Sequence, residues 1–216
     1  MAKKTESVVA EIRPLDIKKV KIKIVGDSPL IVHCFDEKSK KEMLDNQTRS
    51  TKTKARDSRN PYDEFIKSLY WLTDMPESTP KAFEEAVNNG AKWGFKACSI
   101  KQAANSAAYR LGWVDNRMGL RGSYFLASEY GDFFEIKGSI PNIREDTVRI
   151  KTGATLRYRA EFSNWYAEMN LEYNASGIIS LEQILNCINA GGYCCGLGEW
   201  RPEKDGNFGR FHIETI

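Results

Sequence analysis

The sequence predicts an α+β fold with a ferredoxin-like (split β-α-β) core and a basic, helix-containing insertion after the first strand. An alternating strand pattern opens the chain, and helical patterns follow it. The second half then shows a run of strand patterns, one helix and a final strand. This order of elements is the one expected of a split β-α-β unit that carries an insertion.

Length and composition predict one ordinary globular domain. The chain has 216 residues, of which 41% are hydrophobic and 28% are charged. The formal net charge of +3 is too small to indicate a nucleic-acid partner by itself. Any evidence for such a partner must come from the local distribution of charge.

Cysteine usage and the N-terminus predict a cytoplasmic protein, in the host cytoplasm if it is phage-encoded. The five cysteines contain no CxxC pattern, which argues against a disulfide framework and a clustered zinc site. The first residues lack the apolar stretch of a signal peptide, and no apolar run reaches membrane-spanning length. We therefore expect no membrane partner. The cysteines are Cys34, Cys98, Cys187, Cys194 and Cys195.

The first third of the chain predicts the start of the core and then the insertion. Residues 1–18 are charged and are predicted to be a flexible lead-in. Residues 20–24 alternate apolar and polar side chains, as a half-buried strand does, and a short buried run follows at 30–35. The core is then expected over residues 19–35 and 96–216, with the insertion over 36–95.

The insertion contains a strongly basic stretch, residues 46–60, with a single acid, Asp57. We predict a surface loop with two alternative roles. It either clamps a nucleic-acid backbone, folding as it binds, or it is only a solvated charged loop. The basic residues are Arg49, Lys52, Lys54, Arg56 and Arg59.

Helix starts are predicted at four places. Two are cap-and-proline pairs, and two are capping boxes in which Ser is followed three residues later by Gln. Gly112 is expected to end the third helix and residues 191–192 the fourth. The pairs are Asn60-Pro61 and Thr79-Pro80, and the boxes are Ser99 with Gln102 and Ser180 with Gln183.

Strands are predicted at 133–140, 147–150, 156–162 and 208–214. Because side chains alternate along a strand, Arg157 and Arg159 share one face, and Arg149 lies on a nearby strand. This arrangement predicts either a platform for a single strand of nucleic acid or cross-strand ion pairs. The pattern shifts phase at residues 163–164, which suggests a bulge or a tight hairpin.

A glycine-rich stretch, GLGEWRPEKDGNFGRF at 196–211, connects the last helix to the last strand. Phosphate-binding loops of the Walker A and dinucleotide types run from a strand into a helix, so this loop is neither. Glycine lets backbone amides approach a phosphate, basic side chains add charge, and tryptophan offers a stacking face. The alternative to ligand binding is that the loop is an ordered turn whose tryptophan covers the core. The candidate residues are Gly196, Gly198, Trp200, Arg201, Lys204, Gly206, Gly209 and Arg210.

The loop and its surroundings resemble the RAMP superfamily, the ferredoxin-like proteins of CRISPR RNA-guided systems. GGYCCGLGEWRPEKDGNFGRFHI matches the glycine-rich loop between the final helix and strand of that family, and VKIKIVGDSPLIVHCF is similar to the first strand of its backbone-forming subunits. With VRI and LRYRAEF, the resemblance touches about half of the chain. The chain also resembles bacteriophage proteins that carry similar stretches. The resemblance implies that the basic insertion grips guide RNA.

RNA cleavage is an alternative to simple nucleic-acid binding. Some RAMP proteins are endoribonucleases with a histidine acid or base, and some backbone subunits cut RNA with an aspartate after the first strand. The resemblance therefore makes His33 and Asp36 the candidates, although a structural role is the commoner one for such a histidine. His212 is expected to face outwards, and we expect neither a metal site nor a cofactor.

The prediction is therefore a non-catalytic protein that binds RNA or single-stranded DNA and assembles along a strand as a homo-oligomer or filament, alone or with CRISPR-type protein subunits. One alternative is a RAMP-like endoribonuclease that uses His33 or Asp36. The other is a phage interaction protein that inhibits or mimics a host CRISPR complex.

Overall fold

The structure, a computed structural model, describes residues 14–34, 59–115, 120–150 and 153–215. Within these ranges helices combine with antiparallel sheets, so the predicted α+β class is confirmed.

One sheet has four antiparallel strands in the order β10-β1-β9-β5. They are β1 (Ile17–Gly26), β5 (Tyr124–Ala127), β9 (Tyr166–Asn174) and β10 (Phe211–Thr215). The alternation along β1 works as predicted, because Ile22 and Ile24 are buried while Lys21 is exposed on the opposite face. This sheet therefore has one apolar face and one charged face.

Two helices cover the apolar face of this sheet: α4 (Cys98–Arg110) and α5 (Leu181–Cys194). They pack closely because small residues lie between them. A Cβ atom on Gly191 would stand 2.6 Å from the backbone nitrogen of Ala104, and one on Gly192 would stand 2.0 Å from the carbonyl oxygen of Phe211. The two glycines thus allow α5 to approach both α4 and β10.

Two predictions about helix ends are wrong, and this packing explains one of them. The glycines at 191–192 do not end α5, which continues to Cys194, because their small size serves contact inside the helix rather than a cap. Helix α4 begins at Cys98 with Ala97 at its N-cap and no side-chain cap, so the predicted Ser99 box does not form. The Ser180 box does form on α5, and Gly112, with φ of +70°, follows α4 as expected.

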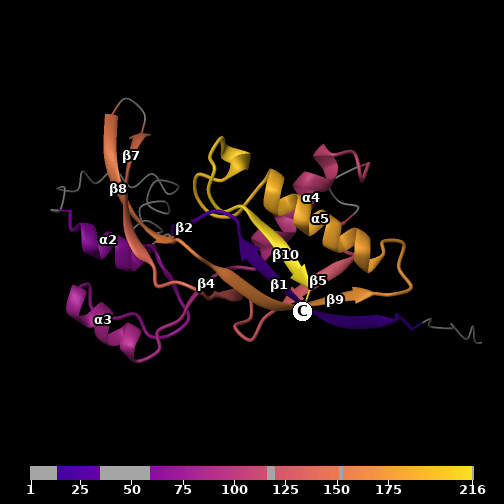
Figure 1. Ribbon diagram of the computed structural model, residues 1–216, viewed down its shortest axis with the longest axis horizontal. Helices are drawn as coiled ribbons and strands as arrows, with labels where there is room; N and C mark the ends of the chain where they lie inside the picture. The colour runs from indigo at the N-terminus through magenta and orange to yellow at the C-terminus, as the bar shows by residue number, and fades with distance from the viewer. Residues whose placement is uncertain (1–13, 35–58, 116–119, 151–152, 216) are drawn as a thin grey trace, which may run out of the picture.

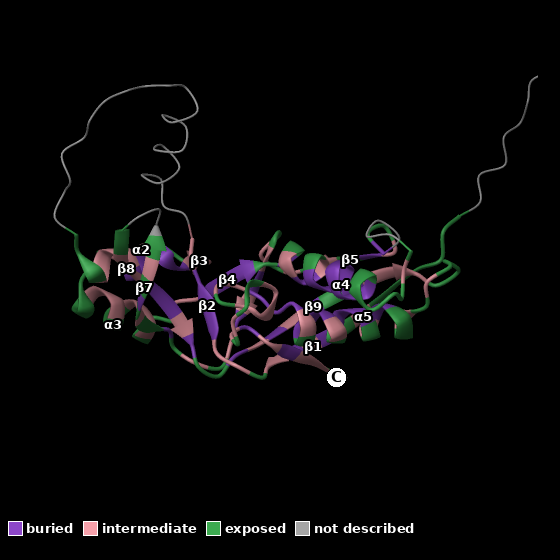
Figure 2. Ribbon diagram, turned by 90° about the horizontal axis from the view of Figure 1, so that it is seen from above, coloured by how far each residue is buried: buried purple, intermediate pink, exposed green. Residues whose placement is uncertain are grey.

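Two further sheets and two helices form the other end of the molecule (Figures 1 and 2). Strands β7 and β8 make a long hairpin, and β8 also pairs with β2. The predicted caps Asn60 and Thr79 open α2 and α3. The elements are β2 (Leu30–Val32), α2 (Pro61–Ser68), β3 (Tyr70–Trp71), α3 (Pro80–Asn88), β4 (Trp93–Lys96), β6 (Phe133–Ile136), β7 (Asn142–Ile150) and β8 (Gly153–Phe162).

Trp165 lies where the chain leaves one sheet for another. Strand β8 pairs with β7 and β2, whereas β9 pairs with β1 and β5, so the predicted bulge or hairpin at residues 163–164 is wrong. The indole Nε1 of Trp165 donates to the carbonyl oxygen of Ser28 at 2.9 Å, and its own carbonyl accepts from the amide of Gly26 at 2.8 Å. The phase shift in the sequence therefore marks a change of sheet.

We predict that Gly192→Ala destabilises the protein, although alanine normally favours a helix. The added methyl group would overlap the Phe211 carbonyl, so we expect the free energy of unfolding to fall by about 1–3 kcal/mol in a urea titration. Gly122→Ala is the control, because its Cβ would meet no heavy atom within 4 Å. A Gly192→Ala variant as stable as the wild type would contradict this account of the packing.

Candidate nucleic-acid interface

The β7–β8 hairpin brings Arg157 and Arg159 onto one face, as the sequence predicts. In its register Arg159 lies opposite Arg144 and Arg157 lies opposite Asp146, so these four side chains share that face. Arg149 lies opposite Ala154 and points to the other face. We call the side with Arg144, Asp146, Arg157 and Arg159 the arginine face.

Ion pairs hold part of the arginine face in place. Arg159 is only 8% exposed, and its Nη1 donates to Oδ2 of Asp146 at 3.1 Å. The other oxygen of Asp146 accepts from Nε of Arg144 at 2.9 Å. Arg144 also pairs with Glu161, and hydrogen bonds to both acids raise its pKa although burial acts in the opposite direction. Asp146 therefore joins two arginines that the sequence alone shows as separate charges.

Arg157 differs from its neighbours on this face. It is half-buried and forms no ion pair within the described ranges, so its guanidinium is available to a ligand. The predicted alternative, cross-strand ion pairing, thus holds for Arg159 and not for Arg157. Arg144 contributes to the face as well, and sequence reasoning missed it. Because side chains two residues apart on a strand share a face, its position two residues before Asp146 was the signal that could have found it.

The glycine loop, residues 195–210, lies against the arginine face. The ring of Phe208 stacks under the Arg144 guanidinium, whose Cζ is 4.4 Å from the ring centroid. A carboxylate oxygen of Glu199 lies 3.9 Å from Nη2 of Arg159. Figure 1 shows this loop, in yellow, between the β7–β8 hairpin and helix α5. Two predicted binding elements, the loop and the strand arginines, are therefore neighbours.

The loop needs its glycines for its own packing. Gly198 has φ of +71°, and a Cβ there would stand 2.2 Å from the carbonyl oxygen of Ile31. Gly209 has φ of +67°, and its Cβ would stand 1.9 Å from the carbonyl oxygen of Leu197. A Cβ on Gly206 would stand 1.7 Å from the Trp200 carbonyl oxygen, whereas Gly196, with φ of +65°, would mainly meet the Pro202 side chain at 2.8 Å. Close backbone contact thus accounts for Gly198, Gly206 and Gly209, and a positive φ accounts for Gly196.

Most amides of the loop already donate hydrogen bonds to protein acceptors, which limits the predicted phosphate contacts. Those that find no acceptor among the described residues are the amides of Gly198, Trp200, Arg201 and Asn207. The amides in use are those of Cys195, Gly196, Leu197, Glu199, Glu203, Lys204, Asp205, Gly206, Phe208, Gly209 and Arg210. Backbone recognition of an anion by this loop is therefore restricted to a few positions.

The side chains of the loop divide into structural and exposed groups. Arg201 donates to the Gly198 carbonyl at 3.0 Å and to Glu203 at 3.1 Å, so it braces the loop from inside. Lys204, in the short helix η1 (Pro202–Lys204), is exposed, and Arg210 is half-buried. Trp200 is 41% exposed and lies outside the buried core, which leaves part of its ring open to a ligand.

Glu203 fastens the loop to helix α4. Its carboxylate accepts from Oγ of Ser106 at 3.1 Å and from Nη2 of Arg110 at 3.2 Å, in addition to Arg201. Burial disfavours the charged carboxylate, but the hydrogen bonds from Arg201 and Ser106 outweigh it and lower the pKa of Glu203. Glu203 is thus a charged anchor for the base of the loop.

Arg59 anchors the end of the basic stretch to the hairpin. Its guanidinium makes a bidentate pair with Glu64 at 2.6 and 2.7 Å, and that pairing raises its pKa. It also donates to the carbonyl oxygen of Leu156 at 2.6 Å and to Oγ1 of Thr155 at 3.0 Å. The candidates Asp36, Arg49, Lys52, Lys54 and Arg56 lie outside the described residues.

His33 follows β2 and lines a polar cavity of about 200 Å³ beneath the glycine loop, together with Tyr70, Glu199 and Arg201. The hydroxyl of Tyr70 donates to the carbonyl oxygen of His33 at 3.3 Å. Burial, aided by nearby acidic groups, raises the pKa of Tyr70 to about 12. His212 lies elsewhere, facing outwards from β10 as expected, with its Nδ1 2.6 Å from Oδ1 of Asp27.

The charged face of the four-stranded sheet, which sequence reasoning did not consider, is not a free basic surface. Its lysines on β1 each pair with a glutamate on a neighbouring strand. Opposite charges on neighbouring strands stabilise a sheet and cancel its potential. The pairs are Lys19 with Glu172, Lys21 with Glu168 and Lys23 with Glu214.

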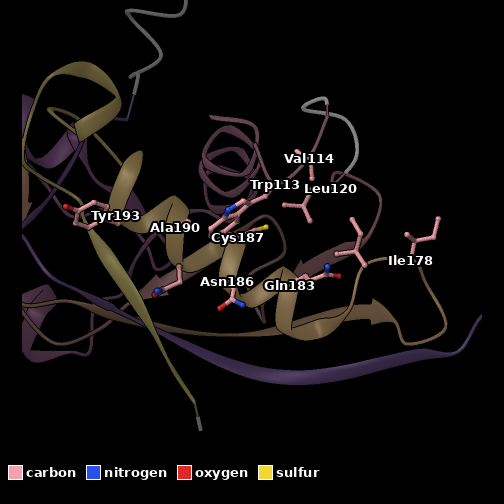
Figure 3. Close-up of a pocket in the computed structure, with 11 residues that line it drawn as sticks. Trp113, Val114, Leu120, Ile178, Gln183, Asn186, Cys187, Ala190 and Tyr193 are labelled. Carbon is pink, nitrogen blue, oxygen red and sulfur yellow. The ribbon is translucent and has the colours of Figure 1, made fainter. Parts of the chain in front are cut away.

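A second, larger cavity of about 900 Å³ lies on the outer side of α5 (Figure 3). Its walls are largely apolar and come from α5, the residues just before it and the segment between α4 and β5, including Trp113, Leu120 and Ile178. None of the predicted site residues lines it. In the described part of the chain, no three histidine, cysteine or acidic side chains gather as metal ligands would. None of the helices described is long and apolar enough to cross a bilayer.

Comparison with models of known protein families gives no match, and comparison with curated protein sequences gives none either.

We predict that Glu203→Gln loosens the glycine loop and lowers the free energy of unfolding by about 1–3 kcal/mol at neutral pH, because charged hydrogen bonds are lost. The folded pKa of Glu203 lies below its ordinary value of 4.5, so this stability is present above that pH and disappears as the pH falls through the folded value. Urea titrations at pH 7 and pH 3 should show the difference from wild type shrinking in acid.

The control for this measurement is Glu84→Gln, which removes an exposed carboxylate on α3 that has no ion-pair partner among the described residues. Its effect should stay within about 0.5 kcal/mol. Equal stability of Glu203→Gln and wild type at pH 7 would show that the carboxylate does not anchor the loop.

Proposed function

We propose that this protein binds single-stranded nucleic acid across the arginine face and the glycine loop. The observation that carries the proposal is that two elements predicted separately from the sequence, the arginine face and the glycine loop, lie side by side. The loop contacts the arginine face through Phe208 and Glu199. Arg59, in the described end of the basic stretch, donates to the Leu156 carbonyl of β8.

The charges on this surface favour a phosphate backbone as the ligand. Arg157 on the arginine face and Lys204 in the loop have no ion-pair partner in the described ranges, and Trp200 of the loop is 41% exposed. Basic side chains that follow a backbone, with aromatic rings for the bases, are the features by which proteins bind single strands without sequence preference. The charged face of the four-stranded sheet is a poorer candidate, because its lysines are paired.

We further propose that the core is ferredoxin-like and related to RAMP proteins. Strands β1, β5, β9 and β10 with helices α4 and α5 follow the order β-α-β-β-α-β, and the sheet order β10-β1-β9-β5 is that of a split β-α-β unit. With this relationship we also propose that several copies of the protein assemble along one nucleic-acid strand, as RAMP backbone subunits do.

Salt dependence tests the binding. We expect a fluorescently labelled single-stranded RNA or DNA to bind at low salt, with log Kd rising linearly with log salt as counterions are released. Arg157→Ala should weaken binding about threefold to tenfold and reduce the salt slope by about 1, because one phosphate contact is lost. No binding of either nucleic acid at low salt would refute the proposal.

The matched control is Arg149→Ala, which removes an arginine from the opposite face of the same hairpin. We expect its effect on Kd to be clearly smaller than that of Arg157→Ala. Equal losses from both variants would show that net charge, and not the arginine face, attracts the nucleic acid.

A further inference from the structure

The polar cavity beneath the glycine loop opens beside the proposed binding surface. It lies between the end of β2, the aromatic strands β3 and β4, the first turn of α4 and the loop backbone. Glu199 links the two, since its side chain lines the cavity and its carboxylate lies 3.9 Å from Arg159 of the arginine face. A strand whose phosphates follow that face would therefore pass the mouth of the cavity.

The size and walls of the cavity suit one nucleobase. Its volume of about 200 Å³ is below the range of about 300–1,000 Å³ that is typical of pockets for drug-sized ligands. Tyr70 and Phe95 form an aromatic wall, with ring centroids 5.6 Å apart and nearly perpendicular. The cavity is also lined by Gly196 and Gly198, and a side chain at Gly198 would collide with the backbone of Ile31. An aromatic wall together with bare backbone is a setting in which a flat base can be held.

The polar groups around the cavity favour one class of base. The carboxylate of Glu199 is 42% exposed, accepts hydrogen bonds and donates none. Ser99 and Gln102, on the first turn of α4, have side chains that make no hydrogen bond to the described residues and can contact the rest of a base. Arg201 and Glu203 are occupied by each other. An exocyclic amino group would satisfy Glu199, whereas the carbonyl edge of uracil would be repelled by it.

We propose that this cavity receives one base from the bound strand and prefers a base that carries an exocyclic amino group, such as cytosine, over uracil. The inference rests on the proposed function, because the surrounding surface has to hold the strand. Glu199 is the residue that reads the base, and the arginine face holds the backbone.

The experiment compares oligocytidine with oligouridine of equal length at one low salt concentration, by fluorescence anisotropy. Cytosine and uracil have the same ring size, so they differ in the group that Glu199 would contact. We expect the wild type to bind oligocytidine about fivefold more tightly. Glu199→Gln should bring the ratio close to one. Ser99→Leu, which fills the cavity from the first turn of α4, should do the same.

Two controls separate base recognition from backbone binding. Arg157→Ala should weaken the binding of both oligonucleotides and leave their ratio unchanged, and Glu182→Gln, an exposed carboxylate in the first turn of α5, should change neither. Binding of both oligonucleotides with no preference, or a preference that Glu199→Gln leaves intact, would overturn the base cavity while the proposed function stands. Failure of the wild type to bind either one would overturn both.

Discussion

Two backbone hydrogen bonds between the glycine loop and the segment around β2 hold the two ends of the molecule together. The amide of Glu199 donates to the Ile31 carbonyl at 2.9 Å, and the amide of Gly209 donates to the Pro29 carbonyl at 2.8 Å. Backbone atoms can meet this closely only where the side chain is a hydrogen atom, which is why Gly198 stands next to Ile31. The placement of the loop against the arginine face, the polar cavity and the position of Trp200 all depend on this contact. The loop is consequently a fixed part of the fold that carries a surface, and most of its amides serve structure.

The proposed binding surface combines two arginines that are fixed by ion pairs, Arg144 and Arg159, with Arg157, which forms no ion pair in the described ranges. Asp146 orients Arg144 and Arg159, and it thereby keeps their positive charge at a defined place on the sheet. Such pairing lowers the net attraction for an anion, since part of the charge is already compensated. In the proposed function, Arg157 and Lys204 provide charge for phosphates, whereas Arg144 and Arg159, held by Asp146, define the shape of the surface. This division explains how a chain with a net charge of only +3 can present a local basic surface.

Local sequence signals predicted the elements well where neighbouring residues decide the outcome. The Ser180 capping box, the cap-and-proline pairs at Asn60 and Thr79, and the glycine after α4 all depend on contacts within a few residues. The shared face of Arg157 and Arg159 follows from the period of a strand alone. Predictions failed where distant segments meet. Helix α5 continues through its two glycines because α4 and β10 need the space, and the chain changes sheets before Trp165, whose indole donates to the distant Ser28 carbonyl.

The sequence by itself determined the α+β class, the strand arginines and the unusual loop between the last helix and the last strand. Only the tertiary structure decided which distant charges are paired, because Asp146 reaches Arg159 from the neighbouring strand, Glu199 reaches Arg159 from the loop, and Glu203 reaches Arg110 of α4. It also decided that the glycines serve close backbone packing and that a cavity lies beneath them. The physical reason is that composition and periodicity act along the chain, whereas ion pairs, steric exclusion and cavities depend on distances between segments that the chain order does not specify.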